Sequence, residues 1–264
     1  MNKNHLVSVI TVVFNGVNYI EDTILSVLNQ TYKNMEYIII DGGSTDGTVD
    51  IIKKYENKIT FWISEKDNGI YDAMNKGTLK SKGKWLNYMN CGDKFYTKDT
   101  VQKVINYINL DTVVVYGNTE IVFDKCNKYV SYSKKDGHKY HHQFMHQSAF
   151  IARSIALKYP YDINFKIAGD TDFFAKLYNK QYKFQHINLI ISSFVVNGIS
   201  SKLSWQMFKE DVIIGQKYNK FFFIMHTMNY IPIIIKRVIV KILPKDIGSR
   251  LRVLYNIYIK NKTI

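Results

Sequence analysis

The feature that most constrains the fold is the segment 7–50, in which two short apolar runs flank a helical pattern. The first run, Val7–Phe14, is apolar at almost every position, which is typical of a buried parallel strand. A helix is predicted over Tyr19–Gln30, because its apolar residues recur at three- and four-residue spacing on one face. The second run, Tyr37–Ile40, leads into a glycine-rich turn. The segment therefore predicts a βαβ unit of a parallel sheet.

The alternation of strands and helices continues along the chain. Helices are predicted after Thr48, at 70–79 and at 100–108, and another begins near residue 172. Further strands are predicted at 59–64, 84–89, 112–116 and 190–196, with a hairpin formed by 120–123 and 129–132. We therefore expect an α/β fold, with a Rossmann-like, mostly parallel sheet flanked by helices.

Polar residues follow each of the early strands, at Asn15, Asp41, 65–69 and 90–93. In open α/β sheets, ligands bind outside the carboxyl ends of the strands, so we expect these residues to line one crevice. The stretch Asp41-Gly42-Gly43 leaves two interpretations open. It is a tight turn before a helix, or it is part of a nucleotide pocket whose carboxylate accepts hydrogen bonds from a base or ribose. It matches neither GxGxxG nor a P-loop, so neither of those sites is indicated.

The charge of the chain is +14 and is concentrated near its end, where 202–264 holds twelve Lys and Arg against three Asp and Glu. A basic excess favours nucleic acid, anionic lipid or phosphate-bearing ligands. No nucleic-acid-binding motif is present, so we expect no nucleic acid partner. The tail mixes apolar, aromatic and basic residues without an 18-residue uncharged run. Two interpretations stay open for it, a helical segment on an anionic membrane and a helix that covers the core.

The cysteines and the first residues both bear on location. Cys91 and Cys126 form no CxxC pair, which favours a reduced, cytoplasmic setting. No signal-peptide pattern precedes the first strand. We therefore expect a cytoplasmic protein.

Four runs occur in a recognisable order, namely TVVFN, SVLNQTY, YIIIDGGSTDGT and EKDNGIYDAMNKG. Together they resemble the family 2 glycosyltransferases, over about residues 5–200. The resemblance implies a GT-A fold, with a nucleotide-sugar half at about 1–95 and an acceptor half at about 96–200. It also implies contacts with a nucleotide-sugar donor at Thr11, Phe14, Asn15, Asp41, Ser44, Asp67, Asn68, Gly69, Asn75, Asn90 and Gly92. The resemblance does not cover 201–264, which we expect, from its apolar and basic composition, to be a membrane-associating helical tail.

The resemblance also points to a metal site after the fourth strand. GT-A enzymes usually carry a DxD motif there, but the equivalent stretch here is Asn90-Cys91-Gly92-Asp93, which keeps only the last acid. Oxygen ligands suit Mg²⁺ or Mn²⁺, so the resemblance implies one of these cations at Asp93. His146, in the run HQSAF, is a second candidate for metal or diphosphate contact. Cys91 is expected to pack, because a soft thiolate matches these cations poorly.

Three other histidines lie just before His146, at positions 138, 141 and 142. The run has no HExxH motif and no cysteine nearby, so a structural zinc site is not favoured. We expect His138, His141 and His142 to lie in a mobile loop.

The run FKIAGDTDFF, at 165–174, precedes an amphipathic helix. It resembles the place where the family carries its catalytic base, and by that match Asp170 is the base and Asp172 the runner-up. The structural alternative is that Asp170 caps the helix. A carboxylate in this role would take the proton of an acceptor hydroxyl as it attacks the sugar, and a single displacement inverts the anomeric centre.

The expected function is that of an inverting glycosyltransferase in bacterial surface polysaccharide biosynthesis. It would move a sugar from a nucleotide diphosphate donor, a UDP-sugar, to a hydroxyl of a glycan or polyprenyl-diphosphate-linked acceptor at the inner face of the plasma membrane. One alternative is a sugar nucleotidyltransferase, which should carry a GxGxR-type loop where this chain has FNGVN. The other is a non-catalytic membrane-surface binding protein, which would need neither Asp93 nor Asp170.

Overall fold

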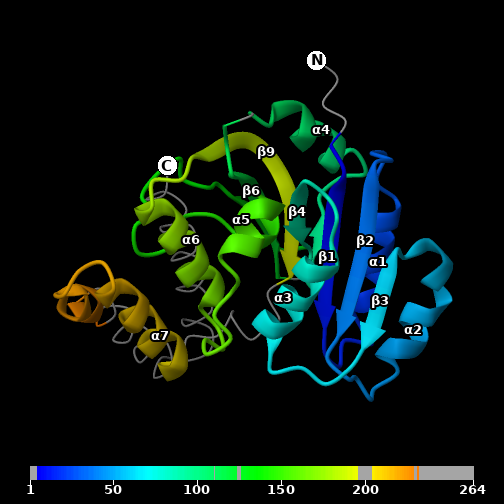
Figure 1. Cartoon of the computed structure of the whole chain (residues 1–264), viewed down its shortest axis with the longest axis horizontal. Coiled ribbons are helices and arrows are strands. Elements are labelled where there is room, and N and C mark those ends of the chain that lie inside the picture. The colour runs from blue at the N-terminus through cyan, green and yellow to red at the C-terminus, as the bar shows by residue number, and fades with distance from the viewer. Residues whose placement is uncertain (1–4, 110, 124–125, 196–203, 229–230, 232–264) are drawn as a thin grey trace. The chain divides into compact units, whose positions relative to one another are not determined.

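The computed structural model describes residues 5–109, 111–123, 126–195, 204–228 and 231. The chain divides into two compact units, Met1–Asp211 and Val212–Ile264. The first unit holds one sheet and the helices that cover it (Figure 1). Most of the predicted tail lies outside the described residues. Among the described helices, none is long and apolar enough to cross a membrane.

The predicted strands and helices occur in the expected order, with shifted ends. The strands are β1 (Val7–Val13), β2 (Met35–Asp41), β3 (Phe61–Ser64), β4 (Trp85–Tyr88), β5 (Lys94–Phe95), β6 (Val114–Val122), β7 (Lys128–Ser131), β8 (Ala149–Ala152) and β9 (Phe184–Val195). The helices are α1 (Ile20–Leu28), α2 (Thr48–Lys54), α3 (Ile70–Lys80), α4 (Thr100–Tyr107), α5 (Arg153–Lys158), α6 (Gly169–Asn179) and α7 (Trp205–Gln216), and the 3₁₀ turns are η1 (Glu56–Lys58) and η2 (His146–Ser148). Of these, β5, β8, α5 and α7 are elements that the sequence patterns did not predict.

The strands form one sheet in the order β3-β2-β1-β4-β8-β6-β9-β5, with β7 paired to β6. The first four strands are parallel, and β8 joins β4 in the antiparallel sense. The expected α/β fold with a mostly parallel sheet is confirmed. One difference is that the predicted strands at 112–116 and 120–123 are a single strand, β6. It stays continuous because it pairs with β9 along its length, with register shifts between 116 and 119.

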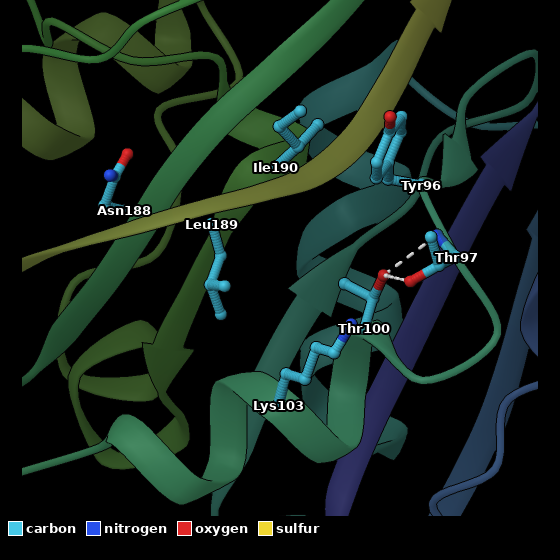
Figure 2. A pocket seen from close by; sticks show the side chains of 7 residues that line it. All are labelled: Tyr96, Thr97, Thr100, Lys103, Asn188, Leu189 and Ile190. Carbon is cyan, nitrogen blue, oxygen red and sulfur yellow. Dashed lines mark hydrogen bonds between the residues drawn. The ribbon is translucent and has the colours of Figure 1, made fainter.

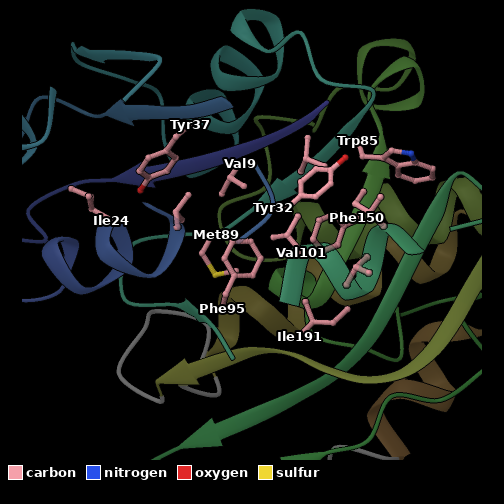
Figure 3. Packing of buried hydrophobic residues seen from close by; sticks show 14 of the residues in the cluster. Val9, Ile24, Tyr32, Tyr37, Trp85, Met89, Phe95, Val101, Phe150 and Ile191 are labelled. Carbon is pink, nitrogen blue, oxygen red and sulfur yellow. The ribbon is translucent and has the colours of Figure 1, made fainter. Parts of the chain in front are cut away.

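The two faces of β1 pack against different helices. Val9 belongs to a buried cluster with Ile24 of α1 and Val101 of α4, which Figure 3 shows. Successive strand residues point to opposite faces, so Ile10 faces the other side, where α3 lies. A Cβ at Gly77 of α3 would lie 2.5 Å from the Cγ2 atom of Ile10. The glycine therefore lets α3 approach the strand closely, and the sheet is buried on both faces.

Candidate active site

The loops after β1 and β2 are joined by hydrogen bonds. The Asn15 amide donates to Ser44 Oγ at 2.7 Å, and Asn15 Oδ1 accepts a hydrogen bond from the Thr45 amide at 3.0 Å. Val17 donates its amide to Asp46 Oδ2 at 3.0 Å. Asn15 adopts a φ of 50°, in the left-handed region that asparagine tolerates better than most residues. The predicted gathering of strand ends at one edge is therefore observed for the first two strands.

Asp41 is fully buried, and both of its carboxylate oxygens are engaged within the turn. Its Oδ2 accepts hydrogen bonds from the amides of Gly43 and Ser44, at 3.0 and 2.9 Å, and from Ser64 Oγ at 2.6 Å. Its Oδ1 accepts one from Ser44 Oγ at 2.5 Å. Of the two interpretations of this stretch, the structure favours the turn. Asp41 organises the loop around it, and Ser44 is tied to the same carboxylate.

An exposed ring and a carboxylate lie beside the backbone at Gly42. The Phe14 side chain is 66% exposed at the end of β1. A Cβ at position 42 would lie 2.5 Å from Asp67 Oδ2 and 3.4 Å from Phe14 Cδ2, so both side chains flank this glycine. Asp67 Oδ1 accepts a hydrogen bond from the Gly69 amide at 2.8 Å, and Gly69 has a φ of 114°. An aromatic face beside a carboxylate oxygen is suited to a nucleobase.

A side chain of the following helix, α3, binds the backbone of Asn68. The Asn68 amide donates to Asp72 Oδ2 at 2.9 Å. Asp72 in turn lies 3.5 Å from Lys76 Nζ, which also pairs with Glu65 at 2.8 Å. These contacts fix the loop between β3 and α3 against the first turns of α3.

Two predicted donor contacts are corrected, because their side chains serve the scaffold. Thr11 is fully buried, and its hydroxyl lies 2.9 Å from the Tyr37 hydroxyl and donates to the Met89 carbonyl at 2.8 Å. Thr11 is in the middle of β1, on the covered side of the strand. Asn75 exchanges two hydrogen bonds with the backbone of Tyr161, at 2.8 and 2.9 Å. Both side chains are thus committed to hydrogen bonds within the protein.

The turn after β4 holds a buried carboxylate. Asp93 is 5% exposed, and burial raises its pKa to about 8, although a hydrogen bond with the Gln147 side chain lowers it. Asn90 Oδ1 and Gln147 Oε1 are buried without a hydrogen-bond partner in the part of the chain that the structure describes. Gly92, at a φ of 99°, donates its amide to Thr23 Oγ1 at 3.0 Å. Two side-chain amide oxygens without donors in the described residues, one in this turn and one in η2, are therefore available beside the Asp93 carboxylate.

Cys91 in this turn packs as expected. Its Sγ donates to the Gly16 carbonyl at 3.7 Å, and burial raises the pKa of the thiol to about 12. The Cys91 thiol is therefore engaged with the backbone of the loop after β1.

The donor atoms of this turn fit a hard cation only in part. Within the described ranges, no group of three His, Cys, Asp or Glu side chains could hold a metal ion. One carboxylate and nearby amide oxygens suit Mg²⁺ or Mn²⁺ if phosphate and water oxygens complete the coordination.

The His146 ring packs among buried aromatic side chains, one residue before the Gln147 that hydrogen-bonds to Asp93. The Nε2 atom of His146 lies 3.3 Å from the Tyr161 hydroxyl, and its ring packs against Tyr88. Burial lowers the pKa of His146, while the charge of Asp170 raises it. The imidazole therefore lies within electrostatic range of Asp170, and its assignment to a metal or diphosphate contact stays a prediction.

The other three histidines of this run lie in a loop, as predicted, but two of them are buried. His138 is 1% exposed and His142 is 7% exposed, while His141 is exposed. Both buried rings pack against Phe144, and His142 also packs against Phe174 of α6. Aromatic packing, which local sequence does not reveal, orders this segment.

Asp170 lies within the first turn of α6. The N-cap residue is Ala168, and no side chain caps the helix, so the capping alternative for Asp170 is not observed. Its Oδ1 accepts a hydrogen bond from the Thr171 amide at 2.8 Å and lies 3.3 Å from the Tyr71 hydroxyl. Its Oδ2 lies 3.7 Å from His142 Nε2. The side chain is 23% exposed, so a substrate hydroxyl has access to it.

Two neutral groups and one further carboxyl group surround Asp170. Burial, together with the charges of Asp170 and Glu210, raises the pKa of the Asp211 carboxyl to about 6, while His141 lowers it. Burial, together with the charges of neighbouring histidines, holds the pKa of His142 well below its usual range. Burial and then the charge of Asp170 raise the pKa of Tyr71. Asp172 is 1% exposed and lies 3.0 Å from Lys176 Nζ. Asp170 is therefore the accessible carboxylate of the two.

Sequence reasoning named neither Tyr71 nor His142 as a neighbour of Asp170, nor Gln147 as a neighbour of Asp93. Tyr71 belongs to the run EKDNGIYDAMNKG, and Gln147 follows His146 in HQSAF. Both therefore lie in runs that already pointed to the site. The signal for His142 was absent, because only the fold brings it beside α6.

A separate pocket lies between α4 and β9 (Figure 2). It has a volume of about 280 Å³ and is lined by Tyr96, Thr97, Thr100, Lys103, Asn188, Leu189 and Ile190. None of the predicted site residues lines it.

This sheet, with helices on both faces and polar loops at its carboxyl edge, is the fold of the GT-A glycosyltransferases. Staphylococcus aureus TarS in complex with UDP aligns with a TM-score of 0.60 and 16% identity, over 82% of this chain and 71% of that chain. The mannosyltransferase PcManGT of Pyrobaculum calidifontis, in complex with GDP-Man and Mn²⁺, aligns with a TM-score of 0.60 and 16% identity. The alignment covers 75% of this chain and 59% of that chain. In an alignment with a longer TarS chain, this chain covers 38% of the length of TarS.

The sequence comparisons give the family. Residues 8–180 match Glycosyl transferase family 2, and the chain belongs to this family. An uncharacterized glycosyltransferase of Mycobacterium tuberculosis is 31% identical over 180 residues, which is 66% of this chain and 69% of that protein. The putative teichuronic acid biosynthesis glycosyltransferase TuaG of Bacillus subtilis is 38% identical over 110 residues, 40% of this chain and 43% of that protein. The chain is thus a glycosyltransferase, not a nucleotidyltransferase or a non-catalytic protein.

Proposed function

We propose that this glycosyltransferase moves a sugar from a UDP-sugar to an acceptor hydroxyl with inversion, and that Asp170 is the base. The observation that carries the proposal is the accessibility of Asp170, a carboxylate 23% exposed beside the buried, neutral Tyr71 and His142 side chains. A carboxylate with one open oxygen can accept a proton from a hydroxyl. Similarity to TarS, solved with UDP, supports the choice of nucleotide.

The chemistry is a single displacement. The acceptor oxygen forms a bond to the anomeric carbon while the bond from that carbon to the β-phosphate oxygen breaks, and Asp170 takes the acceptor proton. The nucleotide leaves as UDP. Phe14 stacks on the base and Asp67 accepts its N–H, while the Asn15 and Asn68 loops line the same edge.

A divalent cation completes this proposal at the turn after β4. Asp93 would hold it, with Asn90 Oδ1 and Gln147 Oε1 nearby as oxygen atoms that lack partners. When bound, the cation neutralises charge that develops on the leaving diphosphate. Similarity to PcManGT, solved with GDP-Man and Mn²⁺, supports a requirement for such an ion.

The test is nucleotide release from a panel of UDP-, GDP- and dTDP-sugars, with Mn²⁺, Mg²⁺ or EDTA. We expect slow release from one UDP-sugar, loss of release in EDTA, and loss of at least about 100-fold in Asp170→Asn. The matched control is Asp162→Asn, in the loop before α6, which should keep wild-type release because asparagine can accept the same local hydrogen bonds. Equal release by Asp170→Asn and wild type would refute the base assignment.

We further infer that the acceptor is a glycan or polyprenyl-diphosphate-linked glycan of a bacterial surface polysaccharide, reached at the inner face of the plasma membrane. The similarity to TuaG supports the class of acceptor. In the described part of the second unit, Phe221 is 73% exposed and Ile224 is 56% exposed, with Lys217 and Lys220 exposed nearby. Exposed apolar and basic side chains together suit an anionic lipid surface.

Vesicle binding tests this surface. The protein should sediment with vesicles containing phosphatidylglycerol, and much less with phosphatidylcholine alone or at high salt. Replacing Lys217 and Lys220 by Gln should weaken sedimentation, whereas the same change at Lys53 and Lys54 on α2 should not. Equal sedimentation with both lipids would show that charge does not guide the contact.

A further inference from the structure

Helix α7 contributes a buried carboxylate to the loop that precedes α6. Glu210 is 2% exposed, although it lies beyond the residues 8–180 that match the family. Its Oε1 accepts hydrogen bonds from the Lys166 amide at 2.8 Å and from Gln206 Nε2 at 2.7 Å. Its Oε2 accepts hydrogen bonds from the amides of Ile167 and Ala168, at 2.9 and 2.8 Å. One carboxylate therefore holds three consecutive backbone N–H groups.

These hydrogen bonds are charge-assisted. Burial raises the pKa of Glu210, but the hydrogen bonds from Gln206 and from the three amides outweigh burial, and the net direction is downward. The carboxylate is therefore ionised at neutral pH, and bonds of this kind are about twice as strong as neutral ones.

The same loop is held from the opposite side by α3. The Tyr71 hydroxyl donates to the Ile167 carbonyl at 2.6 Å and lies 3.3 Å from Asp170 Oδ1. Ile167 is thus fixed at its amide by Glu210 and at its carbonyl by Tyr71. Ala168 is the N-cap residue of α6, so the direction in which the helix begins, and with it the position of Asp170, follows from this loop.

We propose that Glu210 is a positioning residue for Asp170, which makes α7 a part of the active site that the family match does not include. The inference rests on the proposed role of Asp170 as base. Glu210 itself touches neither donor nor acceptor. It acts by fixing the backbone at 166–168, so that the carboxylate two residues later meets the acceptor hydroxyl in one geometry.

Glu210→Gln tests the proposal, because an amide NH₂ would replace one carboxylate oxygen and face backbone N–H groups. We expect kcat for nucleotide release to fall about 10- to 100-fold, since small displacements of a catalytic group cost this much. KM for the donor should stay within about twofold, because the donor loops are untouched. The matched control is Lys209→Gln, the exposed neighbour on the same helix, which should behave as wild type.

Two readouts separate positioning from a general structural role. In an Asp170→Asn background, Glu210→Gln should have no further effect on kcat, because residues that act as one unit are not additive. Hydrogen exchange at the 166–168 amides should be faster in Glu210→Gln than in Lys209→Gln. If Glu210→Gln does not fold, Glu210→Asp keeps the charge with a shorter reach, and the same two readouts apply to it.

Each outcome decides the proposal. Wild-type kcat and wild-type exchange in Glu210→Gln would overturn it, and so would an equal fold-loss in the wild-type and Asp170→Asn backgrounds. The proposed function fails differently. If Asp170→Asn alone keeps full release while exchange at 166–168 still rises in Glu210→Gln, the loop anchor is real but the base lies elsewhere, and the positioning role is overturned with it.

Discussion

The Oδ2 atom of Asp67 lies directly over Gly42, at 2.5 Å from the position that a Cβ would occupy there. We therefore predict that Gly42→Ala displaces the Asp67 carboxylate. Because that carboxylate is proposed to accept the base N–H, UDP affinity should fall about tenfold or more, measured by calorimetry. Combining Gly42→Ala with Asp67→Ala should add little beyond Asp67→Ala alone. Additive losses would mean that the glycine acts by another route.

Phe14→Ala should weaken UDP binding without destabilising the fold. The side chain is 66% exposed, so its removal should change the free energy of unfolding by less than about 0.5 kcal/mol. Loss of a stacking partner costs roughly 1–3 kcal/mol per base, which corresponds to a drop in UDP affinity of about 5- to 150-fold. Tyr107→Ala, at the end of α4, is the control with a comparably exposed ring. Unchanged UDP affinity in Phe14→Ala would place the base elsewhere.

Asp41 is predicted to matter more for stability than for donor recognition. Asp41→Ala leaves two amides and two hydroxyls of the turn without their acceptor, so the free energy of unfolding should fall by about 3 kcal/mol or more. Asp41→Asn should lose less, because one oxygen remains and its NH₂ can donate to Ser44 Oγ. Urea denaturation of both variants, with UDP binding measured on Asp41→Asn, checks this. A folded Asp41→Asn that has lost UDP binding would instead support the nucleotide interpretation.

His138 should make the fold sensitive to mild acid. The Gln143 amide donates to its Nδ1 at 3.1 Å, so the proton is on Nε2, which lies 3.0 Å from the Tyr116 hydroxyl. The Tyr116 hydroxyl then donates to the Lys134 carbonyl at 2.8 Å. This series of three hydrogen bonds is complete only when the His138 ring is neutral. Burial lowers the pKa of His138 from 6.5 to about 4.

The sign of the effect follows from the depressed pKa. The unfolded chain binds a proton at this ring below pH 6.5 and the folded chain only below about pH 4, so the stabilisation is complete above pH 6.5 and is lost as pH falls toward 4. Between pH 7.5 and 5 this ring should account for a loss on the order of 2 kcal/mol. His138→Asn should reduce the pH dependence of unfolding by that amount. An identical pH dependence in wild type and variant would contradict the assignment.

The local pattern of the sequence was sufficient for the order of elements. Apolar runs such as Val7–Val13 and the three- to four-residue spacing in α1 reflect burial on one or two faces, which each segment encodes by itself. The gathering of Asn15 and Asp41 at one edge also followed, because parallel strands place their carboxyl ends together. The continuity of β6 could not be predicted in this way, because it depends on pairing with β9, many residues later in the sequence.

The family, the βαβ frame and the candidate base could be read from the amino-acid sequence, because they rest on short runs with local chemistry. The directions of the side chains could not, since they follow from how distant segments pack. The tertiary structure turned Asp41 inward to its own loop, buried Thr11, and placed His142 and Glu210 around α6. Thr11 with Met89 and Glu210 with the 166–168 backbone are partners 42 to 78 residues apart, and no local pattern specifies a partner at that separation.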